Sequence, residues 1–437
     1  MTDLPRRHQG ARGATAIRHG RLPRRRAVGT IAKIFAAAVA VVAVSATSVA
    51  AYAVWDVTRS VKPTIHLAAP VPGTKAQSIP SVAAIEGGVN LLITGTDSRS
   101  GLGGIYETRA EQNASSGAGN NDVTMLLHIA QDHKSAVVVS FPRDLMVPIP
   151  RCPALNGKGT IGASTYAQFN TALSRAGVPC VALTVQKLMG VTIPYAAEIN
   201  FAGVSAMSTA VGGVTVCLAT PVKDKYTNPA LNLPAGENTL VGDQALSFLR
   251  SRHGVGDGSD LGRISNQQVF LSALARKVVS GGVLGNPLQL YSLAKAATNN
   301  MKLSDTLDPT TMVQIGLALK DTGLENVVFV QYPSVTDPDN VNRVIPYKSA
   351  AAALSNALVE DVPVVLTGKT GRAAEDPTAG STPTPTVPPA DPAVPPTPPA
   401  SVDPSAQATP GTSTPVALPP SITGQTAAQQ TCTKGNN

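Results

Sequence analysis

Three arginines and two glutamines crowd residues 250–268, which read RSRHGVGDGSDLGRISNQQ. A guanidinium group can bind a phosphate through two parallel hydrogen bonds, and its charge is permanent. One such side chain alone is typical of a solvated surface. Several planar donors in one short stretch indicate a common anionic ligand, and the stretch therefore predicts a site for a phosphate or pyrophosphate group.

The spacing of these donors predicts the local backbone. Arg250 and Arg252 would lie on opposite sides of a helix but on the same side of an extended chain, so we expect a helix to end near Leu249. Arg263 and Gln267 stand four residues apart at the head of the next helical pattern, which places them on one face. The N-terminus of that helix would add free N–H groups that favour anions.

Two aspartates, Asp97 and Asp122, are candidates for one rim of the predicted sheet, where its strands end. Asp97 follows the apolar run VNLLITGT, and Asp122 begins DVTMLLHIAQDHKSAVVVSFPRD, two apolar runs around a polar turn. A turn at residues 131–134 pairs these runs so that Asp122 lies opposite Arg143, and ligands of open α/β sheets gather at strand ends. Two carboxylates without a histidine or cysteine partner suit Mg²⁺, with Mn²⁺ as the alternative. The other interpretation, in which each aspartate only caps a turn, stays open.

The elements that would position these residues alternate between strand and helix patterns. Strand-like runs include VNLLITGTD and ENVVFVQYP, and helical patterns include TVQKLMG, GDQALSFL, SNQQVFLSALARKVV and SAAAALSNAL. This alternation predicts an α/β fold, an α-β-α sandwich with a central mixed β-sheet flanked by helices.

The charge distribution argues against a nucleic-acid partner. The 437 residues contain 35 Lys and Arg against 27 Asp and Glu, and residues 1–33 hold nine of the basic residues and one of the acids. The remainder therefore carries 35 − 9 = 26 basic and 27 − 1 = 26 acidic residues. A DNA-binding domain would show a basic footprint, which this neutral body lacks.

The basic tail precedes a segment without charge, IFAAAVAVVAVSATSVAAYAVW, residues 34–55. Its 22 residues would reach about 33 Å as a helix, enough to span a bilayer. The basic flank predicts a single-pass membrane protein with a cytoplasmic N-terminus. A cleaved signal peptide is the alternative interpretation.

Composition divides the rest of the chain. We expect a linker over residues 56–82, one extracytoplasmic domain over 83–367, and a Pro-rich disordered tail over 368–437, because the tail offers little apolar surface to bury. An oxidising location favours disulfides. A Cys152–Cys180 bond is the first choice, pairings with Cys217 stay open, and Cys432 has no assigned partner.

Several common catalytic motifs are missing. The sequence has no G-x-S-x-G elbow, no P-loop, and no C-x-x-C or H-E-x-x-H zinc pattern. The chemistry must therefore come from the aspartates and arginines described above.

Those residues also carry a family resemblance. The segments LLITGTDSR, NDVTMLLHI, SFPRD, LPAGENTLVGDQALSFLRSRH and DLGRISNQQVFL, in this order behind one apolar segment, resemble the LytR-CpsA-Psr family of bacterial cell-wall proteins. The resemblance covers nearly all of the expected extracytoplasmic domain. It implies a Mg²⁺-dependent phosphotransferase that moves a glycopolymer from a polyprenyl-pyrophosphate carrier onto a hydroxyl of peptidoglycan, through a phosphodiester.

The resemblance also implies roles for individual residues. The metal ligands would be Asp97 and Asp122. The catalytic residues would be Asp97, Arg143, Asp144 and Arg263. The pyrophosphate would be held by Arg99, Arg143, Arg250, Arg252, Arg263 and Gln267. Either Asp97 or Asp144 would accept the proton of the incoming hydroxyl. Many members carry a lysine where this chain has Gln168, in QFNTA, which removes one expected cation.

Two other functions remain as alternatives. One is hydrolysis of the polyprenyl pyrophosphate, and the other is a non-catalytic wall-binding or regulatory membrane protein. The Arg-, Ala- and Pro-rich composition favours an actinobacterial source, in which arabinogalactan would be a natural donor polymer. In every version the expected location is the cell membrane, with the domain facing the wall.

Overall fold

The structure is a computed structural model in which the chain divides into two compact units, Met1–Asp56 and Val57–Asn437. The described residues are 56, 65–67, 87–96, 119–155, 157–280, 282–283, 287–377 and 414–436. The predicted basic tail, the predicted membrane helix at 34–55, Asp97 and Arg99 lie outside these residues. Within them, no helix is both long and apolar enough to cross a bilayer.

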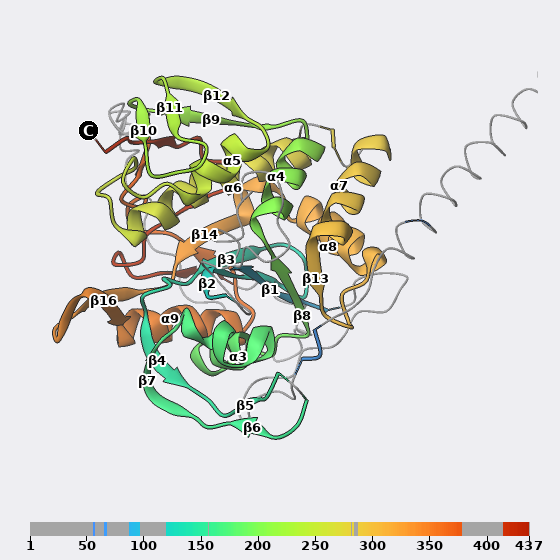
Figure 1. The fold of residues 1–437 in the computed structure, drawn as a ribbon, viewed down its shortest axis with the longest axis vertical. Helices are drawn as coiled ribbons and strands as arrows, with labels where there is room; N and C mark the ends of the chain where they lie inside the picture. Colours follow the sequence, from blue (N-terminus) through green and yellow to red (C-terminus); the bar gives the residue numbers. More distant parts are fainter. Residues whose placement is uncertain are drawn as a thin grey trace, which may run out of the picture. The chain divides into compact units, whose positions relative to one another are not determined.

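A seven-stranded mixed sheet forms the centre of the second unit (Figure 1). The order is β13-β8-β1-β2-β3-β14-β20, in which β1 runs parallel to β8, β3 runs parallel to β14, and all other neighbours are antiparallel. The strands are β1 (Val89–Thr96), β2 (Asn121–Ile129), β3 (Ala136–Ser140), β8 (Tyr195–Ile199), β13 (Met301–Leu303), β14 (Val327–Gln331) and β20 (Gly424–Thr426). This confirms the predicted mixed α/β fold.

The β2–β3 hairpin has the predicted register. Met125 pairs with Ser140 and Ile129 with Ala136, so the turn falls at residues 131–134. Side chains alternate between the two faces of the sheet, as the two-residue period of a strand requires. Leu126 enters the hydrophobic cluster on one face and Leu127 enters the cluster on the other.

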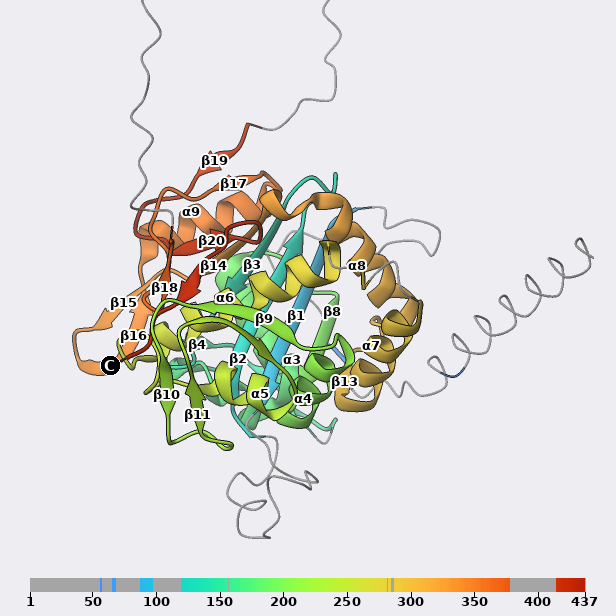
Figure 2. The same ribbon diagram turned by 90° about the horizontal axis from the view of Figure 1, so that it is seen from above.

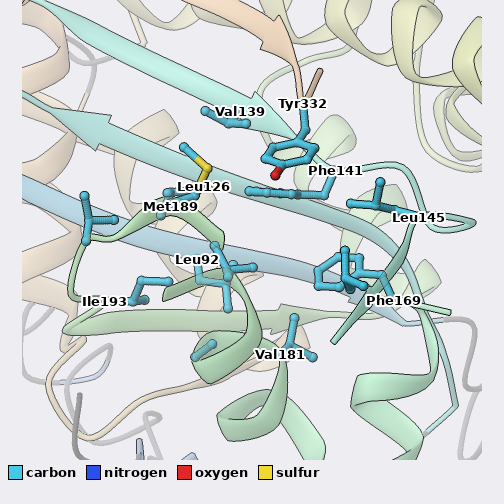
Figure 3. Close-up of a cluster of buried hydrophobic side chains, with 14 of the residues drawn as sticks. Leu92, Leu126, Val139, Phe141, Leu145, Phe169, Val181, Met189, Ile193 and Tyr332 are labelled. Carbon is cyan, nitrogen blue, oxygen red and sulfur yellow. The ribbon is translucent and has the colours of Figure 1, made fainter. Parts of the chain in front are cut away.

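One face of the sheet is covered by α3 (Thr171–Met189) and α9 (Lys348–Val359). The cluster between them contains Leu92, Leu126 and Val139 of the sheet, and all three are buried. Figure 3 shows this cluster, in which the rings of Phe141 and Tyr332 stack with centroids 5.1 Å apart. Below we call this side of the sheet the packed face.

The opposite face is covered by α4 (Phe201–Ala210), α5 (Asp243–Arg250), α6 (Asp260–Ser280), α7 (Pro287–Asn300) and α8 (Pro309–Thr322) (Figures 1 and 2). Asn200 caps α4 by accepting a hydrogen bond from Gly203 N at 2.9 Å, and Asp308 caps α8 by accepting one from Thr311 N at 2.7 Å. A second sheet with the order β12-β9-β21-β18 packs against α6, so the helices lie between two sheets.

The remaining strands are short. The second sheet consists of β9 (Val214–Leu218), β12 (Gly236–Leu240), β18 (Ala374–Glu375) and β21 (Cys432–Thr433). Two-stranded pairs are formed by β4 (Met146–Ile149) with β7 (Ser164–Gln168), β5 (Cys152–Pro153) with β6 (Thr160–Ile161), β10 (Val222–Asp224) with β11 (Leu231–Leu233), β15 (Ser334–Asp337) with β16 (Asn340–Pro346), and β17 (Val364–Val365) with β19 (Val416–Ala417). One 3₁₀ turn, η1 (Leu324–Asn326), precedes β14.

The predicted C-terminal boundary is wrong for two stretches. The sequence predicts a disordered tail from residue 368, but β18 belongs to the second sheet, and residues 414–436 supply β19, β20 and β21. The composition of residues 414–436 does not predict these strands. They form because β20 pairs with β14 and β21 pairs with β9 through backbone hydrogen bonds. Residues 378–413, the most Pro-rich part, lie outside the described residues.

Two disulfides connect the chain. The Cys152–Cys180 bond is present as the first choice predicted, and it joins β5 to α3. Cys217 instead pairs with Cys432, so the C-terminal segment is covalently bound to β9. This second bond is a further reason why the segment is part of the domain.

Candidate functional site

A cavity of about 490 Å³ lies between the central sheet and the helices of the second face. Most of its lining is apolar and comes from β1, β2 and α4 to α7, including Ile93, Met125, Val204, Leu249, Phe270 and Leu293. A volume of this size is within the range of about 300–1,000 Å³ that is common for small-molecule sites. The cavity is therefore large enough for an extended apolar ligand.

The polar part of the lining contains most of the residues that the sequence singled out. They are Asp122, Arg143, Arg250, Arg252, Arg263 and Gln267. The structure thus brings together side chains from two separate parts of the sequence. Their functional roles stay predictions, as do those of Asp97 and Arg99, which lie outside the described residues.

Asp122 and Arg143 meet because of the hairpin register. Asp122 lies near the start of β2, and Arg143 follows the end of β3, so both are at the end of the hairpin opposite its turn. Arg143 Nη1 donates a hydrogen bond to Asp122 Oδ1 at 2.9 Å. The predicted proximity is confirmed, and each side chain remains about one quarter exposed, at 23%.

Arg250 and Arg252 reach the same cavity because α5 ends between them. Ser251 is in an extended conformation, with φ −59° and ψ 132°, directly after the last helical residue, Arg250. The guanidinium of Arg250 lies 4.2 Å from the centre of the Phe201 ring, a cation–π contact with α4. The predicted end of the helix is confirmed to within one residue.

Arg263 and Gln267 lie on one face of α6, one turn apart. Arg263 is buried and donates from Nη2 to the backbone oxygen of Asp122 at 2.7 Å. It also forms an ion pair with Asp260 Oδ1 at 2.7 Å. Gln267 Nε2 donates to the backbone oxygen of Leu249 at 3.0 Å, which ties α6 to the end of α5.

Asp260 was not among the predicted site residues, although it is an acid to which structural arginines could be tied. Its Oδ1 atom lies 2.7 Å from Arg263, 3.4 Å from Arg252 and 3.7 Å from Arg143, so one carboxylate is shared by three arginines. It stands three residues before Arg263 in the first turn of α6, and this i,i+3 spacing was a signal that could have identified it.

The cluster nevertheless keeps a positive surplus. Among the described residues, the cluster and its direct ion-pair partners comprise five arginines (143, 250, 252, 263 and 343) and three aspartates (122, 144 and 260), which leaves 5 − 3 = 2 positive charges. Burial lowers the pKa of Arg263 below its ordinary value, against the opposing effect of Asp260 and Asp122. For Arg143, burial also lowers the pKa, but Asp122, Asp260 and Asp144 raise it more, so its pKa lies above the ordinary value.

Some polar atoms of the cluster have no hydrogen-bond partner within the described residues. The Nε atoms of Arg143, Arg252 and Arg263 are buried without one, and so is Asp260 Oδ2. A buried donor without a partner destabilises a fold by about 1–3 kcal/mol. The Nε atom of Arg143 still lies within ion-pair distance of Asp144 and Asp260, at 3.5 and 3.7 Å, so the donors with the least compensation are those of Arg252 and Arg263.

A second group of contacts surrounds Asp144. Its Oδ1 atom accepts hydrogen bonds from Gln168 Nε2 at 2.6 Å and from Arg343 Nη1 at 3.1 Å, and its Oδ2 atom lies 3.5 Å from Arg143 Nε. Gln168 therefore contacts a carboxylate, and Arg343 on β16 supplies a cation beside it. No motif in the sequence pointed to Arg343, which lies in a polar hairpin far along the chain.

Of the two predicted ligands for a divalent cation, the structure describes only Asp122. Asp122 offers a partly exposed carboxylate in the cavity lining, which suits a hard cation. Across the described part of the chain, no group of three or more His, Cys, Asp or Glu side chains is positioned to hold a metal. The predicted Asp97–Asp122 pair stays a prediction because Asp97 is not described.

Comparison with known proteins gives a consistent result. The model of the LytR_cpsA_psr family matches residues 58–360. The chain is 31% identical over 269 residues to the cell wall biosynthesis protein LcpA of Corynebacterium glutamicum, covering 57% of this chain and 51% of LcpA. It is 30% identical over 191 residues to the polyisoprenyl-teichoic acid–peptidoglycan teichoic acid transferase TagU of Bacillus cereus, covering 44% of this chain and 56% of TagU. The matched region thus spans about half the length of these curated relatives.

A solved structure shares the fold. The protein gbs0355 from Streptococcus agalactiae superimposes with a TM-score of 0.50 and 24% sequence identity, covering 63% of this chain and 88% of that one. This likeness confirms the arrangement of a central mixed sheet with helices.

Proposed function

The chain belongs to the LytR_cpsA_psr family, and we propose that it is a membrane-anchored phosphotransferase that moves a glycopolymer from a polyprenyl-pyrophosphate carrier onto a cell-wall hydroxyl. The observation that carries the proposal is a single cavity with two kinds of lining. Its body is apolar and its polar part holds four arginines. A prenyl pyrophosphate has the matching two parts, an apolar chain and a compact polyanion.

The apolar part of the proposed ligand fits the helical side of the cavity. Leu246, Leu249, Leu271 and Leu274 line it from α5 and α6. Burial of a prenyl chain against such side chains contributes about 25 cal/mol for each Å² of apolar surface removed from water. This contribution would hold the lipid carrier without any fixed hydrogen bond to the chain.

The anionic part fits the arginine cluster. A pyrophosphate would supply hydrogen-bond acceptors for the Nε donors of Arg252 and Arg263 and would offset the positive surplus. In the proposed reaction the acceptor hydroxyl attacks the phosphorus that bears the glycan. A new P–O bond forms to the acceptor, the bond from that phosphorus to the bridging oxygen breaks, and the prenyl phosphate leaves. Arginines stabilise the charge on the leaving phosphate.

A carboxylate must accept the proton of the hydroxyl. Asp144 already accepts two hydrogen bonds at Oδ1 and lies beside Arg143, which favours a role in positioning that arginine. Asp97 is therefore the preferred candidate for the base among the two predicted from the sequence. Replacing Asp144 with Asn tests this assignment: a positioning role predicts weaker pyrophosphate binding, whereas a base would lower turnover and leave binding unchanged.

A divalent cation such as Mg²⁺ would be held by Asp122 together with Asp97, and its charge would offset that of the pyrophosphate. The test is thermal unfolding of the wild type and of Asp122→Asn with and without MgCl₂. Mg²⁺ should raise the melting temperature of the wild type only. An equal increase in both proteins would exclude Asp122 as a ligand.

The membrane anchor is proposed from residues 34–55. A reporter fused after Lys33 should be active only in the cytoplasm, and one fused near Lys369 only outside it. Release of the domain into the medium without residues 34–55 would instead identify that segment as a cleaved signal.

The decisive experiment measures binding of farnesyl pyrophosphate to Arg252→Ala. Arg252 is the best choice because it is partly exposed and its ion pair with Asp260 is long, at 3.4 Å, so the fold should tolerate its loss. Loss of a charge-assisted hydrogen bond of about 1.5–3 kcal/mol predicts affinity about 10- to 150-fold weaker. Arg151→Ala is the matched control, because this exposed arginine contacts Thr160 and lies outside the cavity lining.

A different outcome for Arg252→Ala would contradict the proposal. A lower melting temperature of Arg252→Ala with unchanged affinity would show that the arginine is structural and would remove the basis of the proposal. Arg263 is less suitable because it is buried and bound to both Asp260 and the Asp122 backbone, so its loss should also lower stability.

A further inference from the structure

The β10–β11 hairpin carries an exposed aromatic side chain that contacts His253, the residue after Arg252. Tyr226 follows β10 and is 69% exposed, the second most exposed of the large hydrophobic residues described. Its ring lies 4.6 Å from the imidazole of His253, at an interplanar angle of 49°, and Lys225 Nζ lies 5.2 Å from the ring centre. The ring is thus held by neighbours while it remains open to solvent.

The ring belongs to a surface hollow of about 400 Å³, which is separate from the apolar cavity. The hollow is lined by polar and aromatic groups that include Lys223, Lys225, Tyr226, Asn232 and His253. Lys223 and Asn232 are register partners across the hairpin, and both are exposed. The ring is therefore surrounded by side chains that can exchange hydrogen bonds with hydroxyl groups.

The β10–β11 hairpin is anchored to the domain by its buried side chains. Val222, Leu231 and Leu233 are buried in the same cluster as Phe248 and Phe270 of the neighbouring helices. In Figure 2 the hairpin projects at the periphery of the domain, beside α5. Since its inward side chains are packed, the outward side chains keep a fixed spacing.

Asp224 connects the hairpin to the turn that carries Arg252. This aspartate is 3% exposed, and its Oδ2 atom accepts hydrogen bonds from Ser251 Oγ at 2.7 Å and from Gly254 N at 3.2 Å. Its Oδ1 atom accepts one from Tyr226 N at 3.0 Å. One buried carboxylate thus connects the backbone of Tyr226 to the Ser251 hydroxyl and the Gly254 backbone, on either side of residues 252 and 253.

We propose that this hollow is a glycan subsite, in which a sugar of the donor packs on the Tyr226 ring and its hydroxyl groups bond to the surrounding side chains. The proposal rests on the proposed function, because it places the sugar next to a pyrophosphate held by Arg252. A sugar has an apolar C–H face and polar edges, and the ring of tyrosine presents a matching negative face at small entropic cost. The first sugars of the donor are bonded to the pyrophosphate, so they must lie close to the arginines.

The test compares two ligands, farnesyl pyrophosphate and farnesyl pyrophosphate that carries di-N-acetylchitobiose. Tyr226→Ala should weaken binding of the glycosylated ligand about 3- to 10-fold and leave binding of the sugar-free ligand unchanged. Tyr226→Phe keeps the ring and should restore most of the affinity. Tyr347→Ala, at the exposed tyrosine that precedes α9 at its N-cap position, is the control for loss of a surface ring.

Each outcome decides one question. If Tyr226→Ala weakens both ligands equally, or neither, the hollow is not a glycan subsite. If the wild type binds neither ligand, the proposed function fails before the subsite is reached. If only the glycosylated ligand is affected and Tyr226→Phe restores it, the subsite is established independently of catalysis. Unchanged melting temperatures of the three variants would show that folding does not account for the difference.

Discussion

One face of the central sheet is closed by packing, whereas the other encloses a cavity of about 490 Å³. The same strands supply both faces: Val137 and Val139 point into the packed face, and Ala136 and Val138 point to the other. The sheet alone therefore does not explain the difference. The covering helices do.

The helices of the packed face present many small residues. Ala172, Ala176 and Ala182 of α3 and Ala350 and Ala357 of α9 are all buried in its cluster. Small side chains let a helix approach a sheet closely and leave little space. On the other face, α4 to α7 lie between two sheets, and side chains such as Leu249 and Phe270 surround the cavity. We infer that stability is concentrated in the packed face and ligand binding in the other.

The largest expected effect concerns the two disulfides, one on each side of the sheet. Cys152–Cys180 closes 28 residues on the packed face, and Cys217–Cys432 closes 215 residues on the cavity side. Loop entropy predicts losses of about 3.6 and about 5.4 kcal/mol when each pair is replaced by alanine. Urea unfolding of the two double variants measures both. A larger loss from the Cys152 and Cys180 pair would show that the packed face depends on its cross-link more than on its side chains.

A second prediction compares two leucines. Leu173 on α3 is fully buried, so Leu173→Ala should lower the free energy of unfolding by about 2–5 kcal/mol. Leu249 on α5 is only partly buried and borders the cavity, so Leu249→Ala should cost about 1 kcal/mol or less. Chemical denaturation of both variants provides the comparison. Equal losses would mean that the cavity wall contributes as much to stability as the packed core.

How much of the fold and of the candidate site could be predicted from the sequence depends on how far apart in the chain the contacting residues lie. The Asp122–Arg143 pair follows from a four-residue turn, and the end of α5 follows from the spacing of Arg250 and Arg252. Both need only neighbouring residues. The apolar runs also predicted the main strands and helices, because period-two and helical patterns are set by burial.

The features that the sequence did not reveal depend on distant partners. β20 and β21 are three and two residues long and include polar side chains such as Gln425 and Thr433, so they carry no apolar pattern. Their order comes from contacts such as Thr433 Oγ1 donating to Asn266 Oδ1 at 2.8 Å on α6. Arg343 likewise meets Asp144 only because β16 returns to β4, 199 residues later in the chain.

A third prediction places the same large side chain on each side of the sheet. Ala172 is fully buried on the packed face, so Ala172→Phe should destabilise the domain by about 1–3 kcal/mol through overpacking. Val204 borders the cavity, so Val204→Phe should change stability by about 0.5 kcal/mol or less and fill space that a prenyl chain would need. Thermal unfolding together with farnesyl pyrophosphate binding tests both parts. Unchanged binding by a stable Val204→Phe protein would place the lipid elsewhere.

The smallest expected effect concerns an acid-sensitive contact on the cavity side. It joins Asp257, in the loop between α5 and α6, to Arg372, in the C-terminal part of the domain. Asp257 Oδ2 accepts a hydrogen bond from Arg372 Nη1 at 2.6 Å. Burial raises the pKa of Asp257, but hydrogen bonds from Ser259 and Arg372 lower it more, so its pKa in the folded state lies below the ordinary value. The contact therefore stabilises the fold above the ordinary pKa of about 4 and is lost as the pH falls through the lower, folded-state value.

Both side chains are about half exposed, which limits the contribution to about 0.5 kcal/mol or less. Arg372→Ala should thus be slightly less stable than the wild type at pH 7, and the difference should shrink as the pH is lowered below about 4. Urea unfolding of both proteins across this pH range measures it. A difference that stays constant down to the lowest pH at which the domain is folded would show that Arg372 acts through packing of its stem, and that this junction is held, like the packed face, by contacts that do not titrate.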